Sequence, residues 1–391
     1  MNRIIFTILL STSILPAFVI GQNVKEYDIF GRMEGVPEGF KVCMEIFNIK
    51  SWDLTGDTAV VGKNGEFHLK GVIPSGGPRY YLMSIGSMIG DRWKAVRMMI
   101  GDNEKITITC KDVAKINHQY IDQFCSIQGS PANYSREILF PSYYLWYQTD
   151  SRLNNYLAKL QDSIGFDRSA VDAILEAKKQ LNLAFYSNIF ESDEPNRVPS
   201  MPWWAWFWSE YTHDSLIVSA YNCLTLEQKK TFYGKLTKEK TRFCEGQPFP
   251  DCSLPSPDGK MISLQKDIIS KSKITLVHFW AYNSVSKKEL QEELRSLYKH
   301  YHDRGFNIIG ISSDHRESLY KQALVEEKYP WLNVSDLKGE DGVVNTLYHE
   351  YGVEANPNTT NVLIDENGKI IAWDVYGMVL QWNLWKYFDR K

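Results

Sequence analysis

Six cysteines give this chain its clearest candidates for redox chemistry. No two of them are separated by the two residues of a Cys-x-x-Cys motif, the spacing typical of a dithiol active site. They permit many disulfide connectivities, and the sequence does not choose among them. The six are Cys43, Cys110, Cys125, Cys223, Cys244 and Cys252.

The surroundings of four of these cysteines suggest their roles. Strand alternation in Lys105–Cys110 places Cys110 on the face of two isoleucines, so we expect it in a core. Cys43 alternates with charged residues and is expected to be exposed. Cys244 and Cys252 flank a predicted domain boundary, and their spacing favours a structural bridge or two unpaired thiols over a redox pair.

The histidines do not have the spacing of a metal site. His300 and His302 lie on a predicted helix, where residues i and i+2 point about 200° apart. His278 falls in a strand of buried character and is interpreted as a core histidine with hydrogen-bond partners. Asp314-His315 follows a predicted strand, but the chain has no G-x-S-x-G nucleophile elbow. We therefore predict no metal and no cofactor.

An aromatic run at 202–208, Pro-Trp-Trp-Ala-Trp-Phe-Trp, has the most unusual composition in the chain. Its helical face is either a platform for a sugar or peptide, or a core or interdomain contact. The second interpretation is favoured, because aromatic stripes at helical spacing usually bury themselves. Exposure of Trp203 and Trp206 would favour the first. The residues expected to share the helical face are Trp204, Phe207, Trp208 and Tyr211.

Periodicity divides the chain into three segments. Residues 22–130 show short alternating runs with an Asn64-Gly65 hairpin signal and are predicted to form an antiparallel β domain. Residues 131–243 show helical periodicity and are predicted to be a helical segment. Residues 244–391 alternate strands with helices, which predicts an α/β domain whose sheet is covered on both faces. The elements expected in this last segment are strands 274–281, 306–312, 361–364 and 369–375, and helices 287–304, 317–329 and 343–351.

Seven short motifs follow one another in the last segment: Gly246–Asp251, Asp258-Gly259, Leu276–Ala281, Lys287–Leu290, Tyr351–Val353, Leu363–Asp365 and Gly368–Ile370. Their order resembles that of the TlpA/ResA-like and AhpC/TSA-like, or redoxin-type, thioredoxin-fold families, which implies a thioredoxin-like domain over 244–391. The first segment resembles, more loosely, the uncharacterised β domain that precedes thioredoxin domains in exported Bacteroidetes proteins. The carriers of that resemblance are Gly31-Arg32, Asp57–Ala59, Asn64–Phe67 and Ile127–Ser130.

The redox motif of these families is missing from the sequence. In them Trp-Ala is followed within a few residues by Cys-x-x-Cys, whereas here Asn283 and Ser286 stand where the attacking and resolving cysteines would be. Neither an amide nor a serine hydroxyl supplies the thiolate that begins the reaction. Thr359 occupies the family's cis-proline position, with Pro357 two residues earlier. Ser286 is instead interpreted as a helix cap, in a capping box with Glu289.

The N-terminus has the features of a secretory signal peptide. Arg3 is followed by an uncharged run that ends at the small residue Gly21, which predicts a signal over 1–21 and export to the periplasm or cell envelope. No later stretch approaches the about 20 apolar residues that span a bilayer, so no transmembrane segment is expected after cleavage. The 44 basic and 47 acidic residues nearly balance, which argues against a nucleic-acid partner.

Three functions are compatible with these patterns. The favoured one is a non-catalytic binding or scaffold protein of the cell envelope, with a protein or an extended peptide as partner. The alternative is a thiol-disulfide oxidoreductase that uses other thiols, such as Cys244 and Cys252, or a thiol of its partner. A third is a glycan-binding module built on the tryptophan run. In the favoured interpretation the contact residues are Trp280, Tyr282, Ser284 and Thr359.

Overall fold

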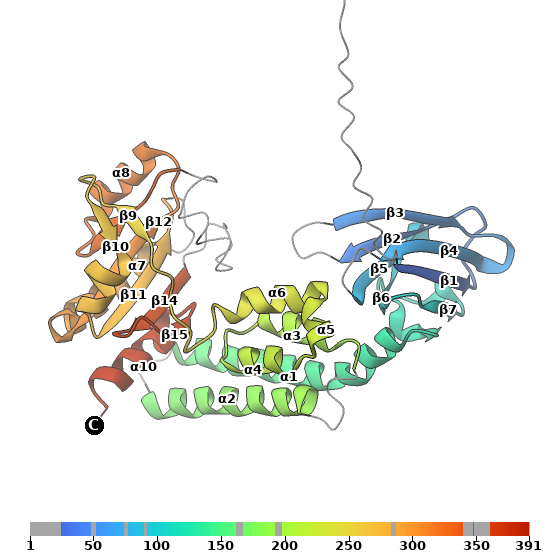
Figure 1. Ribbon diagram of the computed structural model, residues 1–391, viewed down its shortest axis with the longest axis horizontal. Coiled ribbons are helices and arrows are strands. Elements are labelled where there is room, and N and C mark those ends of the chain that lie inside the picture. The colour runs from blue at the N-terminus through green and yellow to red at the C-terminus, as the bar shows by residue number, and fades with distance from the viewer. Residues whose placement is uncertain are drawn as a thin grey trace, which may run out of the picture.

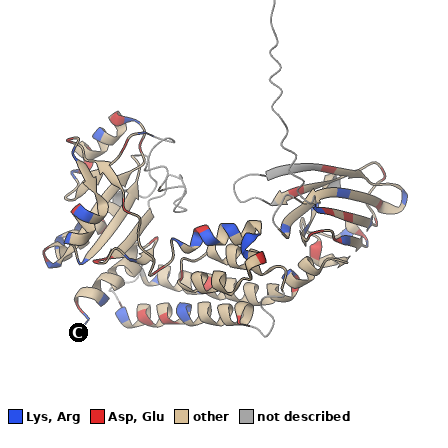
Figure 2. Ribbon diagram, viewed as in Figure 1, with Lys and Arg blue, Asp and Glu red and all other residues tan. Residues whose placement is uncertain are grey.

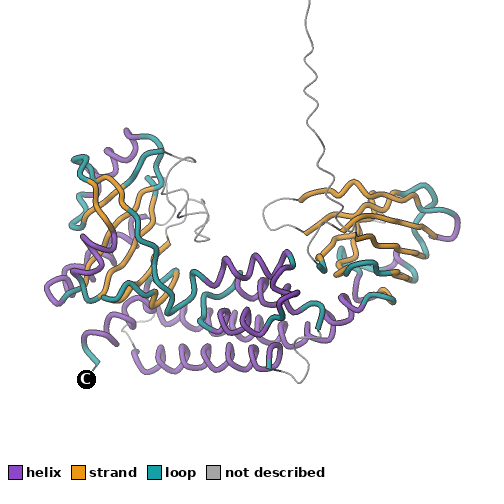
Figure 3. Tube along the Cα trace, in the orientation of Figure 1, coloured by secondary structure: helices purple, strands orange, loops and turns teal. Residues whose placement is uncertain are grey.

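The computed structural model of the protein has two sheet-containing parts at opposite ends of a layer of helices (Figure 1). The strands that the structure describes lie at these two ends, and the described layer between them is helical (Figure 3). The structure describes residues 25–47, 52–73, 77–89, 92–161, 167–191, 198–282, 287–338, 347 and 360–390. The predicted signal peptide, 1–21, lies outside these ranges.

Within the described residues, the first part is a sandwich of two four-stranded sheets. One sheet consists, in order, of β4 (Glu66–Ile73), β1 (Lys25–Met33), β7 (Lys105–Cys110) and β8 (Cys125–Gln128). The other consists of β3 (Trp52–Val60), β2 (Lys41–Phe47), β5 (Arg79–Ile89) and β6 (Arg92–Ile100). Their facing side chains form one core, in which the rings of Tyr27 and Tyr81 lie 5.8 Å apart. Cys110 is buried in this core, as predicted, while Cys43 is half-buried rather than exposed.

Two strand pairings in the sandwich differ from the predicted antiparallel arrangement. β1 and β7 run parallel, so their sheet is mixed. β3 and β4, which were expected to form a hairpin, belong to different sheets. The turn between them does adopt the positive φ that its sequence favours, 64° at Asn64 and 77° at Gly65. It carries the chain from one sheet to the other, because each strand finds its hydrogen-bond partner elsewhere in the sandwich.

The central layer begins with α1 (Pro131–Gln161), which is tied to the edge of the second sheet. Ser130 Oγ accepts a hydrogen bond from the Asn133 amide at 3.1 Å and so caps the helix. The same hydroxyl donates to the Met99 carbonyl of β6 at 3.0 Å. Asp167 caps the second long helix by accepting two backbone N–H groups. The other helices are α2 (Arg168–Phe190), α3 (Met201–Ser209), α4 (Leu216–Cys223), α5 (Leu226–Lys230) and α6 (Phe232–Thr241).

The C-terminal part is built on a five-stranded sheet, counted over the described residues. Its order is β13 (Leu332–Val334), β12 (Phe306–Ser312), β11 (Ile274–Trp280), β14 (Thr360–Asp365) and β15 (Ile370–Trp373). β11, β12 and β13 are parallel, and β14 and β15 are antiparallel to their neighbours. A short hairpin of β9 (Ser253–Pro255) and β10 (Met261–Ser263) precedes the sheet. The predicted strands and two of the predicted helices therefore lie close to their expected positions.

Both faces of this sheet are covered. On one face, α7 (Lys287–Tyr301) and α10 (Gly377–Phe388) contribute Leu294 and Leu380 to a core with the strands. On the other face, Phe249 and Leu264 from the opening segment pack against Val277 of β11. α8 (Glu317–Glu327) lies beside the end of β11.

The last helix also joins the C-terminal part to the helical layer. Met378 and Trp382 of α10 pack against Val171 of α2, beside Leu157 of α1. Charged residues of both signs are interspersed along the helices and strands, in keeping with the balanced composition (Figure 2). None of the helices in the described part of the chain combines the length and the apolar character that a membrane crossing requires.

Candidate functional site

The carboxyl ends of three parallel strands meet at one edge of the C-terminal sheet. β11 ends at Trp280, β12 at Ser312 and β13 at Val334, and β12 pairs with both of the others. β14 starts at the same edge, because Thr360 pairs with Phe279. In open sheets of parallel strands, ligands bind in the crevice beyond the carboxyl ends. The segments that follow these strands therefore form the candidate site.

Trp280, predicted to contact a peptide, is a core residue. Its side chain is 2% exposed, and its indole Nε1 donates a hydrogen bond to Asn333 Oδ1 at 3.0 Å. The rings of Tyr320 and Tyr329 lie 6.0 Å and 5.3 Å from it. The prediction of direct ligand contact is wrong for this residue, because α8 and β13 cover it.

Asp314 fixes the backbone just before residues 283–286, the predicted redox loop, where the related families carry their two cysteines. The Tyr282 amide donates to both carboxylate oxygens of Asp314, at 3.1 Å and 3.0 Å. The Ser312 hydroxyl donates to the same carboxylate at 2.8 Å. Hydrogen bonds to a carboxylate are stronger than those between neutral groups, so the position of Tyr282 is well defined. The sequence analysis considered Asp314 only as a hydrolase residue. An acidic residue just after a buried strand is itself a signal of a site at that edge of the sheet.

Tyr282 and Leu337 are two partly exposed apolar side chains at this edge. Both are half-buried and pack against the cluster that contains Trp280 and Tyr320. The Tyr282 hydroxyl donates to Glu326 Oε1 at 3.5 Å. Leu337 adopts a φ of 55°, a left-handed conformation that is uncommon for a leucine and typical of strained backbone at functional sites. No sequence motif pointed to this leucine.

His278 lies beneath the site as a buried neutral imidazole. Its Nδ1 lies 2.8 Å from Asn361 Oδ1, and its Nε2 lies 3.1 Å from Gln291 Nε2. An amide oxygen can only accept and an amide nitrogen can only donate, so the proton resides on Nδ1. Burial lowers the pKa of His278 to about 4, although the bond to Asn361 acts in the opposite direction. The prediction of a satisfied core histidine is confirmed.

Several predicted site residues lie outside the described residues. They are Asn283, Ser284 and Ser286 of the predicted redox loop and Thr359 at the predicted cis-proline position, with Pro357 beside it. The predicted capping box begins at Ser286 and is likewise not described, and of the predicted helix 343–351 only Leu347 is. These assignments stay predictions.

Cys244 and Cys252 do not form a dithiol pair in the structure. Cys244 is buried in the core of the helical layer, whereas Cys252 packs against the core of the C-terminal sheet. Both are free thiols. Burial raises the pKa of each to about 12. Neither has the exposed thiol of low pKa that an oxidoreductase requires.

The tryptophan run forms the core of the helical layer. Trp203 and Trp206 are 3% and 5% exposed, and Trp204 and Trp208 are fully buried. The ring of Trp206 packs against that of Tyr233 of α6, with centroids 4.9 Å apart and planes tilted by 32°. A glycan platform requires exposed rings, so that interpretation is contradicted and the core interpretation is confirmed.

Two family descriptions match parts of the chain. Residues 246–373 match the AhpC/TSA family. Taken with the sheet order, this match settles the fold. The C-terminal part is a thioredoxin-fold domain of the redoxin type. Residues 27–135 match a domain of unknown function, DUF4369, which agrees with the looser resemblance of the first segment.

Solved structures similar to the redoxin-type domain include two from Bacteroides. One is the C-terminal domain of a putative thiol-disulfide oxidoreductase from Bacteroides thetaiotaomicron, 29% identical, with 38% of this chain and 97% of that chain covered and a TM-score of 0.34. Another is a thiol:disulfide interchange protein from Bacteroides sp., 27% identical, with 38% and 92% covered and a TM-score of 0.34. No curated protein matches the chain at a significant level.

Proposed function

We propose that this chain is an exported protein of the cell envelope whose redoxin-type domain is a binding or scaffold surface and does not catalyse thiol–disulfide exchange. The observation that carries the proposal is the distribution of thiols. None of the six cysteines follows Cys252, so the segment after Trp280 contains no thiol. Exchange proceeds through a mixed disulfide with an attacking thiolate, and this segment supplies none.

The other thiols near this domain are poor substitutes. A thiol with a pKa of about 12, as for Cys244 and Cys252, is ionised to only about one part in 10⁵ at neutral pH. Cys244 is 1% exposed, which also prevents direct attack on a substrate. These properties support binding over the alternative of an oxidoreductase that works through these two residues.

The edge described above is suited to an extended polypeptide. Asp314 holds the Tyr282 backbone in place, and the half-buried side chains of Tyr282 and Leu337 offer apolar contacts to a partner. Ser284 and Thr359 are the further contact residues in this proposal. Backbone hydrogen bonds would supply affinity without a strong sequence preference.

Binding can be measured with a probe that cannot exchange disulfides. We suggest fluorescently labelled α-lactalbumin, reduced and carboxamidomethylated, titrated with the mature protein. Tyr282→Ala is expected to weaken binding by about tenfold, equivalent to about 1.4 kcal/mol. Val325→Ala is the matched control, because Val325 is 72% exposed on α8 of the same domain. Absence of binding by the natural protein, or equal losses in both variants, would contradict the proposal.

Export is a separate part of the proposal and rests on the N-terminal pattern. Expression in a bacterial host should give a periplasmic protein whose first residue is Gln22. N-terminal sequencing of the fractionated protein checks this, and a cytoplasmic protein that retains Arg3 would contradict it.

A further inference from the structure

Cys110 and Cys125 lie directly opposite each other on β7 and β8 of the N-terminal sandwich. Opposite residues of an antiparallel pair have Cα atoms about 4.5 to 5.5 Å apart. Disulfides span Cα separations of about 4.4 to 6.8 Å, so this register is compatible with a bridge. Both side chains lie on the core face, where Cys110 is buried and Cys125 is half-buried. Each thiol shifts the pKa of the other, as expected for close neighbours.

The segment that joins the two cysteines, 111–124, is held in place by a buried lysine. Lys94 is 1% exposed, and its ammonium donates to the backbone carbonyls of Ile116 and His118. The backbone of the segment also pairs with β6, because the Ala95 amide donates to the Gln119 carbonyl at 2.9 Å. These bonds fix the loop without any help from sulfur.

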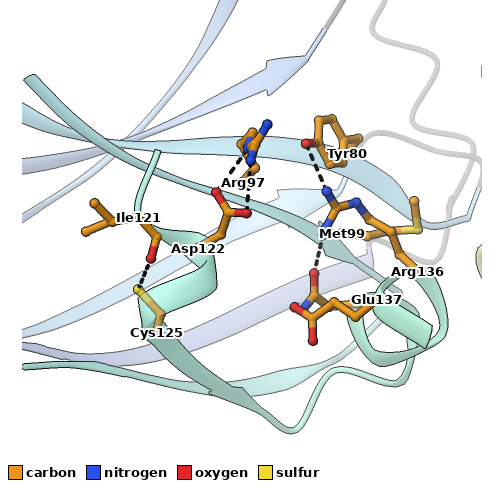
Figure 4. Close-up of polar contacts among 9 residues, drawn as sticks. Tyr80, Arg97, Met99, Ile121, Asp122, Cys125, Arg136 and Glu137 are labelled. Atoms are coloured by element: carbon orange, nitrogen blue, oxygen red, sulfur yellow. Dashed lines mark hydrogen bonds and ion pairs between the residues drawn. The ribbon is translucent and has the colours of Figure 1, made fainter. Parts of the chain in front are cut away.

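The end of the same segment is fixed just before β8. Arg97 makes two hydrogen bonds to Asp122, at 3.0 Å and 3.1 Å, and Cys125 Sγ donates to the Ile121 carbonyl at 3.1 Å (Figure 4). Both cysteines are therefore presented by backbone that is already ordered. A bond between their sulfur atoms requires little movement of either strand.

We propose that Cys110 and Cys125 form a reversible disulfide, which makes the N-terminal sandwich a redox-sensitive site separate from the redoxin-type domain. The co-reactant is an external disulfide such as glutathione disulfide. Cys125, the more exposed thiol, attacks it to form a mixed disulfide and releases one thiolate. Cys110 then attacks the Cys125 sulfur and releases the second thiolate. The two cysteine protons pass to the two products, so the cysteines are oxidised and the external disulfide is reduced.

The environment of the pair favours the second step over the first. The neighbouring Cys125 thiol lowers the pKa of Cys110, so Cys110 is the thiol that ionises first. The same contact, together with burial, raises the pKa of Cys125. Attack by Cys125 should therefore limit the rate of oxidation, and that rate should increase with pH.

No other two cysteines of the described residues face each other across paired strands. Cys244 and Cys252 belong to different cores, and Cys223 lies 3.4 Å from the Tyr186 hydroxyl. Cys43 faces Thr58 and Ser84 on its two neighbouring strands. The bridge is thus expected to be specific to one pair.

The test counts thiols in the full mature chain after equilibration with glutathione disulfide. The protein is unfolded and labelled with a maleimide, with and without prior reduction. Two of the six cysteines should be protected, which leaves four labelled before reduction and six after it. A non-reducing digest should yield one peptide pair, joined through Cys110 and Cys125. Six labelled thiols before reduction, or a link between other cysteines, would overturn the proposal.

Two single substitutions separate this bridge from random oxidation. In Cys125→Ser, five thiols should be labelled both before and after reduction, because Cys110 has lost its partner. In Cys43→Ser, the bridge should persist, with three labelled before reduction and five after it. Protection of any thiol in Cys125→Ser, or loss of protection in Cys43→Ser, would contradict the assignment.

Discussion

Acid should destabilise this protein partly through His278, which is buried and neutral. Burial lowers its folded-state pKa to about 4 from an ordinary value near 6.5. As the pH falls from about 6.5 to about 4, the unfolded chain binds a proton that the folded chain refuses, so stability decreases over this window and levels off below it. A difference of about 2.5 pKa units corresponds to about 3 kcal/mol at the lower end.

His278→Leu isolates this contribution. Near pH 7.5 the variant should be less stable than the natural protein, because Asn361 Oδ1 and Gln291 Nε2 lose their buried partner at a cost of about 1 to 3 kcal/mol each. Near pH 4 that deficit should be smaller by about 3 kcal/mol. Protonation of His278 in the unfolded chain has by then destabilised the natural protein, and the variant has no histidine at this position. Burial also lowers the pKa of His213 to about 4. Its protonation changes the stability of both proteins alike, so it cancels in the difference between them.

The assay is urea unfolding of the two proteins over this pH range, with nitrogen NMR of the imidazole as a direct check. At about pH 5 the spectrum should show a neutral ring protonated on Nδ1. A stability difference that stays constant with pH, or an imidazolium at about pH 5, would refute the reasoning.

Three further predictions concern single positions, each measured by chemical denaturation. Gly65→Ala should cost more stability than Gly39→Ala, for which about 1 kcal/mol is expected. Both glycines have positive φ, but only at Gly65 would a new Cβ lie 2.1 Å from a backbone oxygen, that of Met33. Equal costs would contradict this reasoning. Asp314→Asn should cost about 1.5 kcal/mol and speed amide exchange at Tyr282, and unchanged exchange would argue against the anchoring role. Trp208→Ala should cost about 3 to 5 kcal/mol, and a loss below 1 kcal/mol would be inconsistent with its burial.

The C-terminal fold was largely predictable because its strands are buried and flanked by helices of clear period. β12 spans the predicted residues 306–312, and α7 begins at the predicted residue, Lys287, and buries Leu294 in the core. α10 was not anticipated. It buries Leu380 against the sheet and Trp382 against the helical layer, so it has no polar stripe to mark its period. β13 has three residues, too few for a pattern.

In the N-terminal sandwich, local chemistry was predictable and pairing was not. The Asn64-Gly65 dipeptide determines its own turn conformation, but which strands pair across the sandwich depends on residues far apart in sequence. The pairing of Cys110 with Cys125 was not predictable for the same reason. At the candidate site, the order of motifs located the segment after Trp280, whereas the burial of Trp280 depends on Asn333 and Tyr320 from other elements.

The central claim is that the redoxin-type domain lacks redox activity because its motif lacks thiols. The most direct measurement is the reduction of insulin by dithiothreitol in the presence of the mature protein, of Cys252→Ser, and of the double variant Asn283→Cys with Ser286→Cys. The natural protein and Cys252→Ser should be no faster than dithiothreitol alone, and the double variant should gain activity. If the natural protein already accelerates reduction, the claim is wrong, and loss of that activity in Cys252→Ser would identify the thiol responsible.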